Sequence, residues 1–239
     1  MKILAIGDIH GRDVWERLIE ENPVDKVVFI GDYVDSFHYS DQDILKNLEK
    51  IIAYKMAHPD TCELLLGNHD IQYLWDEPLY RCSGYRFVMK PELHEIFNTC
   101  KGIFKVAYQY DAHLFTHAGI SKRWADQYLA QILKELPREA DLAECLNMAV
   151  DSKKLRDLLF ELGPSSGGMR HDHSGIVWAR PADIFATAPF DDEIHQVVGH
   201  TGMRSVQTTN KFLDKVYPNA SVTFIDTYGV NTTPYILTL

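Results

Sequence analysis

The sequence predicts a layered α/β fold, and three observations near its N-terminus support that prediction. Residues 2–6 (KILAI) and 26–30 (KVVFI) are continuous apolar runs with the length of buried strands. Residues 12–21 lie between them and carry apolar side chains at helical spacing: Val14, Trp15, Leu18 and Ile19. A third apolar run, CELLL at 62–66, also follows a helical segment. Strands that alternate with helices build a parallel sheet through right-handed crossovers.

The longest predicted helix in this first part covers residues 41–57. Ser40 or Asp41 suits its N-cap, because a side-chain oxygen there accepts a hydrogen bond from a free backbone N–H. Its apolar residues fall on one stripe, which we expect to face the sheet: Ile44, Leu45, Leu48, Ile51 and Ile52.

The rest of the chain continues this alternation less regularly. Residues 122–162 are predicted to be mostly helical, and residues 163–175 form a Gly/Ser-rich loop. Strands are predicted at 103–110, 112–119, 176–180 (IVWAR), 195–200, 222–227 and 234–239. A length of 239 residues fits one domain, residues 1–239, with a helical elaboration at about 122–175.

The composition excludes several classes of protein. The chain holds 24 Lys+Arg against 34 Asp+Glu, and this net charge of −10 argues against nucleic acid as a partner. Its four cysteines form no CxxC pair, which argues against a zinc knuckle. The N-terminal apolar run is too short for a signal peptide, and no run approaches the ~18 residues that span a bilayer. We therefore expect a cytoplasmic protein that does not bind membranes.

Polar side chains follow five of the apolar runs, and most of them come just after a glycine. In open α/β sheets, the crevice at the carboxyl ends of the strands is where ligands bind, so we expect these residues to meet there. They are Asp8 and His10 (ILAIGDIHG), Asp32 and Asp35 (VVFIGDYVD), Asn68, His69 and Asp70 (LLLGNHD), His117 (LFTHAG) and His200 (QVVGHTG).

The types and spacing of these residues favour a metal centre. Asp8 and His10 are two positions apart, so in an extended segment they face the same side and can hold one cation. Asn68 and His69 are adjacent, so in extended geometry one can bind a metal while the other remains free for acid–base chemistry. Carboxylate, imidazole and amide ligands suit Mn²⁺, Fe or Zn²⁺. Two such ions about 3.5–4 Å apart form a clamp for displacement at phosphorus.

The ordered set GDIHG, GDYVD, GNHD, THAG and VGHT closely resembles the calcineurin-like metallophosphoesterase superfamily. It is most similar to the branch that contains serine/threonine protein phosphatases and bis(5′-nucleosyl)-tetraphosphatases. The motifs run from residue 7 to about 202, with VWARP and FIDTYG in further support. The resemblance implies a sandwich of two mixed β-sheets flanked by helices, with the active site at the carboxyl ends of the strands.

The resemblance also implies a role for each residue. Asp8 and His10 would hold the first of two divalent ions, Asp32 would bridge both, and the second would be held by Asn68, His117 and His200. The ions are expected to be Mn²⁺, with Fe or Zn²⁺ as alternatives, and a hydroxide between them would be the nucleophile. His69 would protonate the leaving oxygen, and Asp35 would orient its ring. Asp70 is expected to act as an outer orienting residue.

Two departures bear on the substrate. The protein phosphatases continue GDYVD with Arg-Gly, whereas this chain has Ser36-Phe37, so the usual phosphate clamp is missing. Arg180 is the first candidate to replace it, followed by Arg81 and Arg86. Gly202 stands where many phosphodiesterase relatives have a second histidine, which favours the phosphatase-like branch.

The predicted activity is hydrolysis of phosphate monoesters, with a small phosphorylated substrate or a phosphopeptide as partner and the oligomeric state left open. A dinucleoside polyphosphate hydrolase remains the enzymatic alternative, and a non-catalytic binding module is the alternative from another class. HDHS, residues 171–174, has the residues of a metal-binding tract, but it sits in a Gly/Ser-rich loop and is expected on a flexible part of the surface. His94 is expected to be exposed. Seven aromatic residues near the motifs are expected to pack in the core, or else to stack on a base or a phosphotyrosine: Tyr33, Phe37, Tyr73, Trp75, Tyr80, Tyr85 and Phe87.

Overall fold

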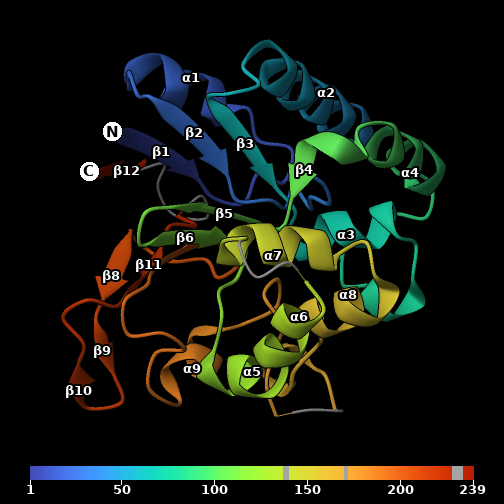
Figure 1. The fold of residues 1–239 in the computed structure, drawn as a ribbon. Coiled ribbons are helices and arrows are strands. Elements are labelled where there is room, and N and C mark those ends of the chain that lie inside the picture. The colour runs from blue at the N-terminus through green and yellow to red at the C-terminus, as the bar shows by residue number, and fades with distance from the viewer. Residues whose placement is uncertain (137–139, 170–171, 228–233) are drawn as a thin grey trace.

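The fold is a sandwich of two five-stranded sheets, as Figure 1 shows for a computed structural model that describes residues 1–136, 140–169, 172–227 and 234–239. The first sheet has the order β12-β1-β2-β3-β4 and the second β5-β6-β7-β11-β8. Strands β1 to β4 are parallel, and β12 adds an antiparallel edge. In the second sheet β6, β7 and β11 are parallel, with antiparallel edges at β5 and β8. The predicted sandwich of two mixed sheets is therefore confirmed.

The strands of the two sheets are β1 (Lys2–Ile6), β2 (Lys26–Phe29), β3 (Cys62–Leu65), β4 (Phe104–Lys105), β12 (Tyr235–Thr238), β5 (Ala107–Tyr110), β6 (His113–Thr116), β7 (His195–Val198), β8 (Gln207–Thr209) and β11 (Ser221–Phe224). The α-helices are α1 (Val14–Glu21), α2 (Asp41–Ala57), α3 (Asn68–Leu74), α4 (Lys90–Thr99), α5 (Lys122–Trp124), α6 (Ala130–Lys134), α7 (Leu142–Ala149), α8 (Lys153–Leu159) and α9 (Pro181–Phe185). A small hairpin, β9 (Lys211–Phe212) with β10 (Lys215–Val216), projects from the second sheet (Figure 1).

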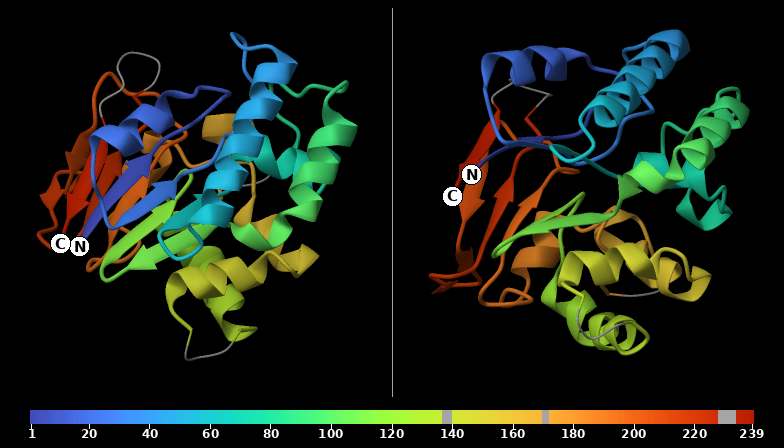
Figure 2. Two further views of the ribbon diagram at one scale, coloured as in Figure 1. Left: turned by 90° about the horizontal axis from the view of Figure 1, so that it is seen from above. Right: turned by 45° about the horizontal axis from the view of Figure 1, so that its top comes forward.

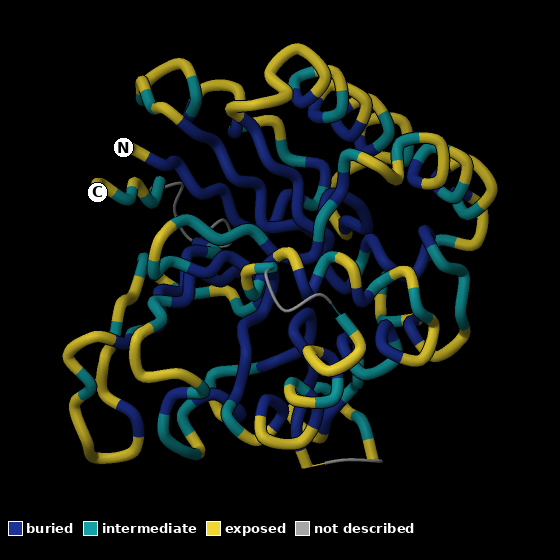
Figure 3. The backbone as a smooth tube through the Cα atoms, viewed as in Figure 1, coloured by how far each residue is buried: buried dark blue, intermediate teal, exposed yellow. Residues whose placement is uncertain are grey.

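Side-chain alternation along the strands explains why three layers pack together. Leu4 and Ile6 of β1 join the cluster that includes Trp15 and Leu18 of α1. Their neighbours Ile3 and Ala5 join a second cluster, with Phe115 and Val197 of the other sheet. Successive residues of a strand point to opposite faces, so each strand of the first sheet contacts helices on one side and strands on the other. Figure 3 shows the consequence: the central strands of the first sheet are buried, and the outer faces of the helices are exposed.

The two ends of the chain lie side by side in the first sheet (Figure 2). Lys2 of β1 is in register with Thr238 of β12, and the N-terminal ammonium group donates to the Leu239 carbonyl at 2.6 Å. The antiparallel β12 therefore closes an edge of the sheet that β1 would otherwise leave unpaired.

The segment predicted as one strand at 103–110 is divided between the two sheets. Its first part, β4, pairs with β3, while β5 pairs with β6. Asn147 of α7 satisfies the backbone at the break, because its Oδ1 accepts from Val106 N at 2.8 Å and Ala107 N at 3.1 Å. Its Nδ2 donates to the Ala107 carbonyl at 2.9 Å. The chain thus crosses from one sheet to the other with its hydrogen bonds intact.

The strand predicted at 176–180 is wrong. Residues 176–178 form a turn, in which Trp178 N and Ala179 N both donate to the Gly175 carbonyl. Ile176 N donates to the Leu159 carbonyl at the end of α8, and the Ile176 carbonyl accepts from Ala118 N. The four apolar side chains from Ile176 to Ala179 are nevertheless buried, which is why the run has the pattern of a strand.

Helices α5 to α8 occupy residues 122–159 and include a π-helical turn at Ala125–Leu129. Trp124, Tyr128 and Ile132, spaced four residues apart, are buried against the core. In Figure 1, α5, α6 and α9 lie below the second sheet, whereas α1 and α2 cover the first. Across the part of the chain that the structure describes, no helix is both long and apolar enough to cross a bilayer.

Candidate metal centre

Five motif loops meet at the carboxyl ends of strands β1, β2, β3, β6 and β7. Backbone bonds join the first two loops, since the Asp32 carbonyl accepts from Ile9 N at 3.0 Å and His10 N at 2.7 Å. The last loop is attached to the first by His200 N, which donates to Asp8 Oδ1 at 2.9 Å. The convergence expected from the positions of the motifs after strands is therefore present in the structure.

The backbone is strained where these loops meet. His10, Asp32, Asp35 and His200 have φ values of 45°, 54°, 58° and 63°. Residues other than glycine seldom adopt the left-handed region, and each such residue costs of order 1–3 kcal/mol. Strain that is concentrated in four predicted site residues indicates that side-chain placement, rather than stability, determines the conformation here.

Two glycines make room for the carboxylates. A Cβ atom at Gly67 would overlap Asp32 Oδ1, and one at Gly199 would lie 2.5 Å from Asp8 Oδ1. A side chain at either position would therefore displace a carboxylate of the site. This requirement explains the glycine that precedes Asn68 and the one that precedes His200.

Asp32 is the centre of the cluster. Its Oδ2 lies 3.6 Å from His10 Nε2 and 3.4 Å from His117 Nε2. Two groups of potential ligand atoms, each lying within 4.8 Å of one another, share it: His10, Asp32 and His69, and Asp32, His117 and His200. Asp32 therefore belongs to both groups, which is the placement that a bridging carboxylate requires.

The histidine tautomers support a cation at this position. His117 Nδ1 is 2.8 Å from the Ile30 carbonyl, so it carries the proton and donates there. The other ring nitrogen, Nε2, faces Asp32 Oδ2 at 3.4 Å and Asn68 Oδ1 at 3.0 Å. His10 repeats this arrangement, with Nδ1 at 2.9 Å from the Val34 carbonyl and Nε2 toward Asp32. Electron pairs that face one another repel unless a proton or a cation lies between them, so these residues fit divalent metals.

His200 supplies a further free donor atom. Its side chain is buried, and its Nε2 has no hydrogen-bond partner among the described residues. Burial, followed by the positive charges of His117 and Arg180, holds the pKa of His200 well below its usual value. A neutral imidazole with an unpartnered buried nitrogen is the form in which histidine binds metals.

Asp32 remains ionised in this environment. Burial favours its protonated form, but His117, His69 and His10 hold the pKa of Asp32 well below the usual value. Burial likewise opposes a charge on His117, yet the Asp32 carboxylate raises the pKa of His117 to about 9. The buried carboxylate therefore favours positive charge beside it, and a divalent cation would supply that charge.

A separate network holds His69. Its Nδ1 donates to Asp35 Oδ2 at 3.0 Å, and the same oxygen accepts from Gln72 Nε2. Tyr73 Oη donates to the other Asp35 oxygen at 2.5 Å. Burial opposes a charge on His69, but the Asp32 charge and the hydrogen bond to Asp35 raise the pKa of His69 well above its usual value. The ring is thus fixed in orientation, with its other nitrogen toward the cluster.

The contacts of Gln72 and Tyr73 with Asp35 are a part of the candidate site that the sequence analysis missed. Both are buried on α3, and Gln72 comes three positions after His69, which places the two on the same face of a helix. The signal in the sequence was Gln72 itself, because a helix that begins at Asn68 would bury this polar side chain on the same face as His69. We expected Asn68 and His69 in extended geometry, and in that geometry the signal cannot be recognised.

The two spacing arguments need correction for that reason. Asn68 and His69 lie in the first turn of α3, and their side chains diverge because adjacent helical residues point in different directions. Asp8 and His10 do not lie on one extended face either, since His10 has a left-handed conformation. Asp8 meets the His200 loop while His10 faces Asp32, and Asp8 is absent from both groups of ligand atoms.

Asp70 orients the loops rather than the ring of His69. Its Oδ2 accepts from Asp32 N at 2.7 Å and Gly67 N at 2.8 Å, and its Oδ1 accepts from Tyr33 N at 2.9 Å. Burial and the Asp32 charge raise the pKa of Asp70, while the N–H donors of Gly67 and Tyr33 oppose that shift. A fully buried carboxyl group with three backbone donors fixes the GDYVD and GNHD loops against each other.

The three candidate arginines differ in their contacts. Arg180 lies at the site, because its guanidinium group donates to the His200 carbonyl at 3.1 Å and to Thr201 Oγ1 at 3.3 Å. Arg86 is engaged in the loop after GDYVD, where it donates to Asp41 and to the Ser36 and Tyr39 carbonyls. Arg81 pairs with Asp76 at 3.5 Å and lies over the ring of Tyr85.

Several secondary expectations can be compared with the structure. His94 is half-buried, with Nδ1 2.7 Å from the Tyr73 carbonyl, so the expected exposure is wrong. His173 is buried against Tyr128 instead of lying on a surface loop, whereas His171 lies outside the described residues. The last two residues of FIDTYG also lie outside them.

The comparisons with known proteins agree with this geometry. A relative from Schizosaccharomyces pombe, named as a provisional serine/threonine-protein phosphatase, is 27% identical over 152 residues. The match covers 59% of this chain and 48% of the relative, so the chain spans about half of that protein's length.

Solved structures share the fold. A cold-active protein-tyrosine phosphatase of a psychrophilic Shewanella species has a TM-score of 0.57 at 19% identity and covers 99% of this chain and 75% of its own. A serine/threonine phosphatase of Saccharomyces cerevisiae has a TM-score of 0.51 at 16% identity and covers 94% and 67%. The family model for calcineurin-like phosphoesterases, a family of metal-dependent enzymes that act on phosphoric esters, matches residues 1–222. The chain belongs to the calcineurin-like phosphoesterase family.

Proposed function

We propose that the protein is a metal-dependent phosphatase that hydrolyses phosphate monoesters at the cluster around Asp32. The observation that carries the proposal is the position of Asp32 Oδ2, 3.6 Å from His10 Nε2 and 3.4 Å from His117 Nε2. One ionised carboxylate between two imidazoles fits a pair of divalent cations better than it fits a single one.

The ligands of that pair are assigned residue by residue. Asp8 and His10 would hold one cation and Asn68, His117 and His200 the other, with Asp32 common to both. The residues suit Mn²⁺, and Fe or Zn²⁺ would also accept the same ligands. Such a pair lowers the pKa of bound water and polarises the phosphoryl oxygens. The relatives named as phosphatases support a phosphoric ester as the substrate.

The residues of the chain provide the remaining chemistry. His69, held through Nδ1 by Asp35, presents its other nitrogen to the cluster and would donate a proton to the oxygen that leaves phosphorus. Asp35 would stabilise the resulting charge distribution, and Gln72 and Tyr73 keep the Asp35 carboxylate in place. Arg180 would neutralise the phosphate, because its guanidinium group lies at the His200 loop. His69 also belongs to the first group of ligand atoms, and its hydrogen bond to Asp35 leads us to assign it as the proton donor.

The test compares three substrates with Mn²⁺ present: nitrophenyl phosphate, bis-nitrophenyl phosphate and diadenosine tetraphosphate. The proposal predicts that the monoester is hydrolysed fastest and that Asp32→Asn loses both turnover and metal. A preference for the dinucleotide would replace the proposal with the dinucleoside polyphosphate hydrolase. A protein that holds two metals per chain and turns over none of the three would support the non-catalytic binding module.

A further inference from the structure

Five of the seven aromatic residues near the motifs fall into two groups. Tyr33, Tyr73 and Tyr80 are completely buried, which confirms that they pack in the core. Phe37 and Phe87 are 82% and 68% exposed. Ser36-Phe37 stands where related phosphatases have Arg-Gly. The exposed ring of Phe37 is therefore a feature in which this chain differs from those phosphatases.

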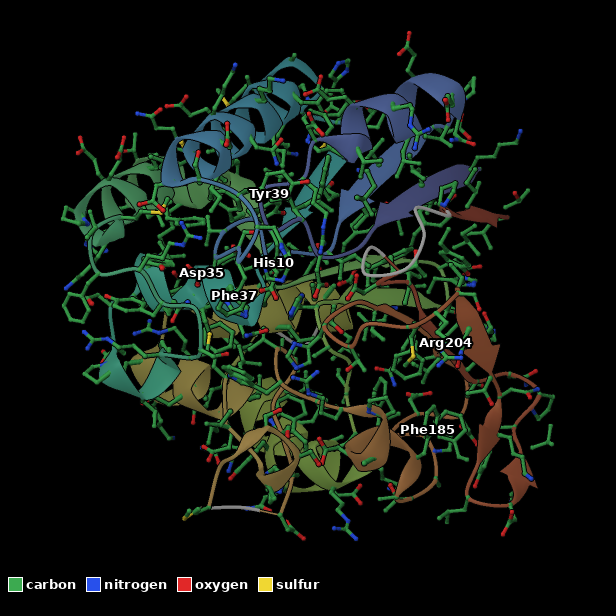
Figure 4. The ribbon with its side chains drawn as sticks, turned by 180° about the vertical axis from the view of Figure 1, so that it is seen from behind. His10, Asp35, Phe37, Tyr39, Phe185 and Arg204 are labelled. Atoms are coloured by element: carbon green, nitrogen blue, oxygen red, sulfur yellow. The ribbon has the colours of Figure 1, made fainter. Side chains whose placement is uncertain are left out.

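Phe37 and His69 both border the position that a side chain of Gly84 would occupy. A methyl group at Gly84 would be 3.6 Å from Phe37 Cζ, 3.7 Å from His69 Cε1 and 3.5 Å from Asp35 Cβ. Gly84 has a φ of +86°, a conformation that side chains disfavour. The space that the missing side chain leaves is therefore bordered both by the edge of the Phe37 ring and by the proposed proton donor, His69. Figure 4 views this edge of the molecule, with Asp35, His10, Phe37 and Tyr39 labelled close together.

The loop that carries Phe37 is held in place. Arg86 donates to the Ser36 and Tyr39 carbonyls on either side of the ring. Ser36 Oγ accepts from His38 N at 3.1 Å and Tyr39 N at 3.3 Å. Arg86 N in turn donates to the Tyr73 hydroxyl, which holds Asp35. The backbone that carries the exposed ring is thus attached to the same network that orients His69.

We propose that Phe37 and the space over Gly84 bind the leaving group of the substrate, and that this group is an aromatic ring attached directly to the phosphate oxygen. The inference rests on the proposed function, because His69 marks the side from which the leaving group departs. A ring bonded to the oxygen that His69 protonates lies over Gly84 and contacts Phe37 at its edge. A small alkyl group leaves Phe37 exposed. In a nucleotide, the sugar holds the base farther from His69.

The test uses kcat/KM of the Mn²⁺-loaded protein with O-phosphotyrosine, O-phosphoserine and adenosine 5′-monophosphate. Phe37→Ala should lower the value for phosphotyrosine about 3- to 10-fold, the size of an aromatic contact, and should change that for phosphoserine less than about twofold. Phe37→Leu, which keeps volume but not the ring, should show an intermediate loss. Phe87→Ala is the matched control: this exposed ring packs on Tyr85 and beneath Arg81, so its removal should leave the preference unchanged.

A binding measurement separates the inference from the proposed function. Phenylphosphonate should bind the metal-loaded protein more tightly than methylphosphonate, and Phe37→Ala should remove the difference. Equal affinities, equal losses on all three substrates, or a loss confined to the nucleotide would each overturn the inference. Turnover of phosphoserine without an aryl preference would leave the proposed function intact. Tight phenylphosphonate binding through Phe37 without turnover of any substrate would sustain the inference and contradict the proposed function.

Discussion

At the scale of single residues, the candidate site contains residues in backbone conformations and environments that these residue types usually avoid. Four of its residues have left-handed backbones, and Asp70 is a fully buried carboxyl group. These features cost stability, and they persist because backbone N–H groups and neighbouring loops hold them. The strained backbone conformations therefore coincide with the candidate site.

Replacing Asp70 by asparagine tests this account of the loops. Both Asp70 oxygens accept from backbone N–H groups, so an amide NH₂ in place of one oxygen leaves a buried donor unsatisfied. We expect Asp70→Asn to lower the free energy of unfolding by about 1–3 kcal/mol. Denaturant unfolding of this variant, beside Asp60→Asn at an exposed position, measures the difference. Unchanged stability would mean that Asp70 is already protonated in the native protein.

Replacing His69 by asparagine tests the proton-donor assignment. Nitrophenolate is a good leaving group that needs little protonation, whereas an alkoxide needs a proton as the bond breaks. His69→Asn should therefore slow hydrolysis of an alkyl phosphate much more than that of nitrophenyl phosphate. Metal content is measured on the same samples. Equal losses on both substrates, or loss of metal, would instead make His69 a ligand.

The sequence was sufficient to predict that the candidate site residues converge, but not their geometry. Asp32, Asn68, His117 and His200 meet because parallel strands direct their carboxyl ends to one edge, and that rule needs only strand positions. The roles of Gln72 and Tyr73 follow from where α3 begins, which an apolar run ending in Gly-Asn-His does not reveal. The exposure of the Phe37 ring could not be predicted from the sequence either, because it depends on neighbours that are distant in sequence.

At the scale of elements, strands that lie between two apolar layers were predictable and short exposed ones were not. β1, β2 and β3 are continuous apolar runs, since each face of these strands is covered. β8, β9 and β10 are two or three residues long and mostly exposed, so nothing in their composition marks them. The run 176–180 shows the opposite error, in which a buried turn has the composition of a strand.

A histidine pair across the second sheet makes stability depend on pH. His113 of β6 is paired in register with His195 of β7, and the rings stack at 4.9 Å. Burial and the His195 charge lower the pKa of His113 below its ordinary 6.5. Because the unfolded chain binds a proton there that the folded chain does not, stability contributed by this pair should fall as the pH drops below about 6.5.

The matching measurement is the free energy of unfolding at pH 7.5 and 5.5 for the natural protein and His113→Gln. The variant should lose less stability on acidification, since its side chain cannot take up a proton. Both proteins keep the metal centre, so its titration cancels in the comparison. Identical pH dependence would show that the pair has no part in acid sensitivity.

At the scale of the whole molecule, the candidate metal centre is built from residues of both halves of the sandwich. Asp8, Asp32 and Asn68 follow strands of the first sheet, whereas His117 and His200 follow strands of the second. Cations held by residues from both sheets bind the folded state and not the unfolded chain. Their binding free energy therefore adds to the stability of the fold as a unit.

Thermal unfolding with increasing Mn²⁺ tests this coupling. At about 100 times the dissociation constant, a bound ion stabilises the fold by about 2.7 kcal/mol, so the midpoint should rise steadily with concentration. Asp32→Asn should show a much smaller rise, and Asp60→Asn should behave as the natural protein does. A midpoint that is insensitive to Mn²⁺ would mean that the sheets are not joined through metal.

The measurement that tests the central claim most directly is a metal titration of the chelator-treated protein, with bound Mn²⁺ per chain and the rate of nitrophenyl phosphate hydrolysis recorded together. The account predicts no hydrolysis without metal, and a rate that rises as the second ion binds and levels off at two per chain. Hydrolysis by the metal-free protein, or two bound ions without hydrolysis, would contradict it.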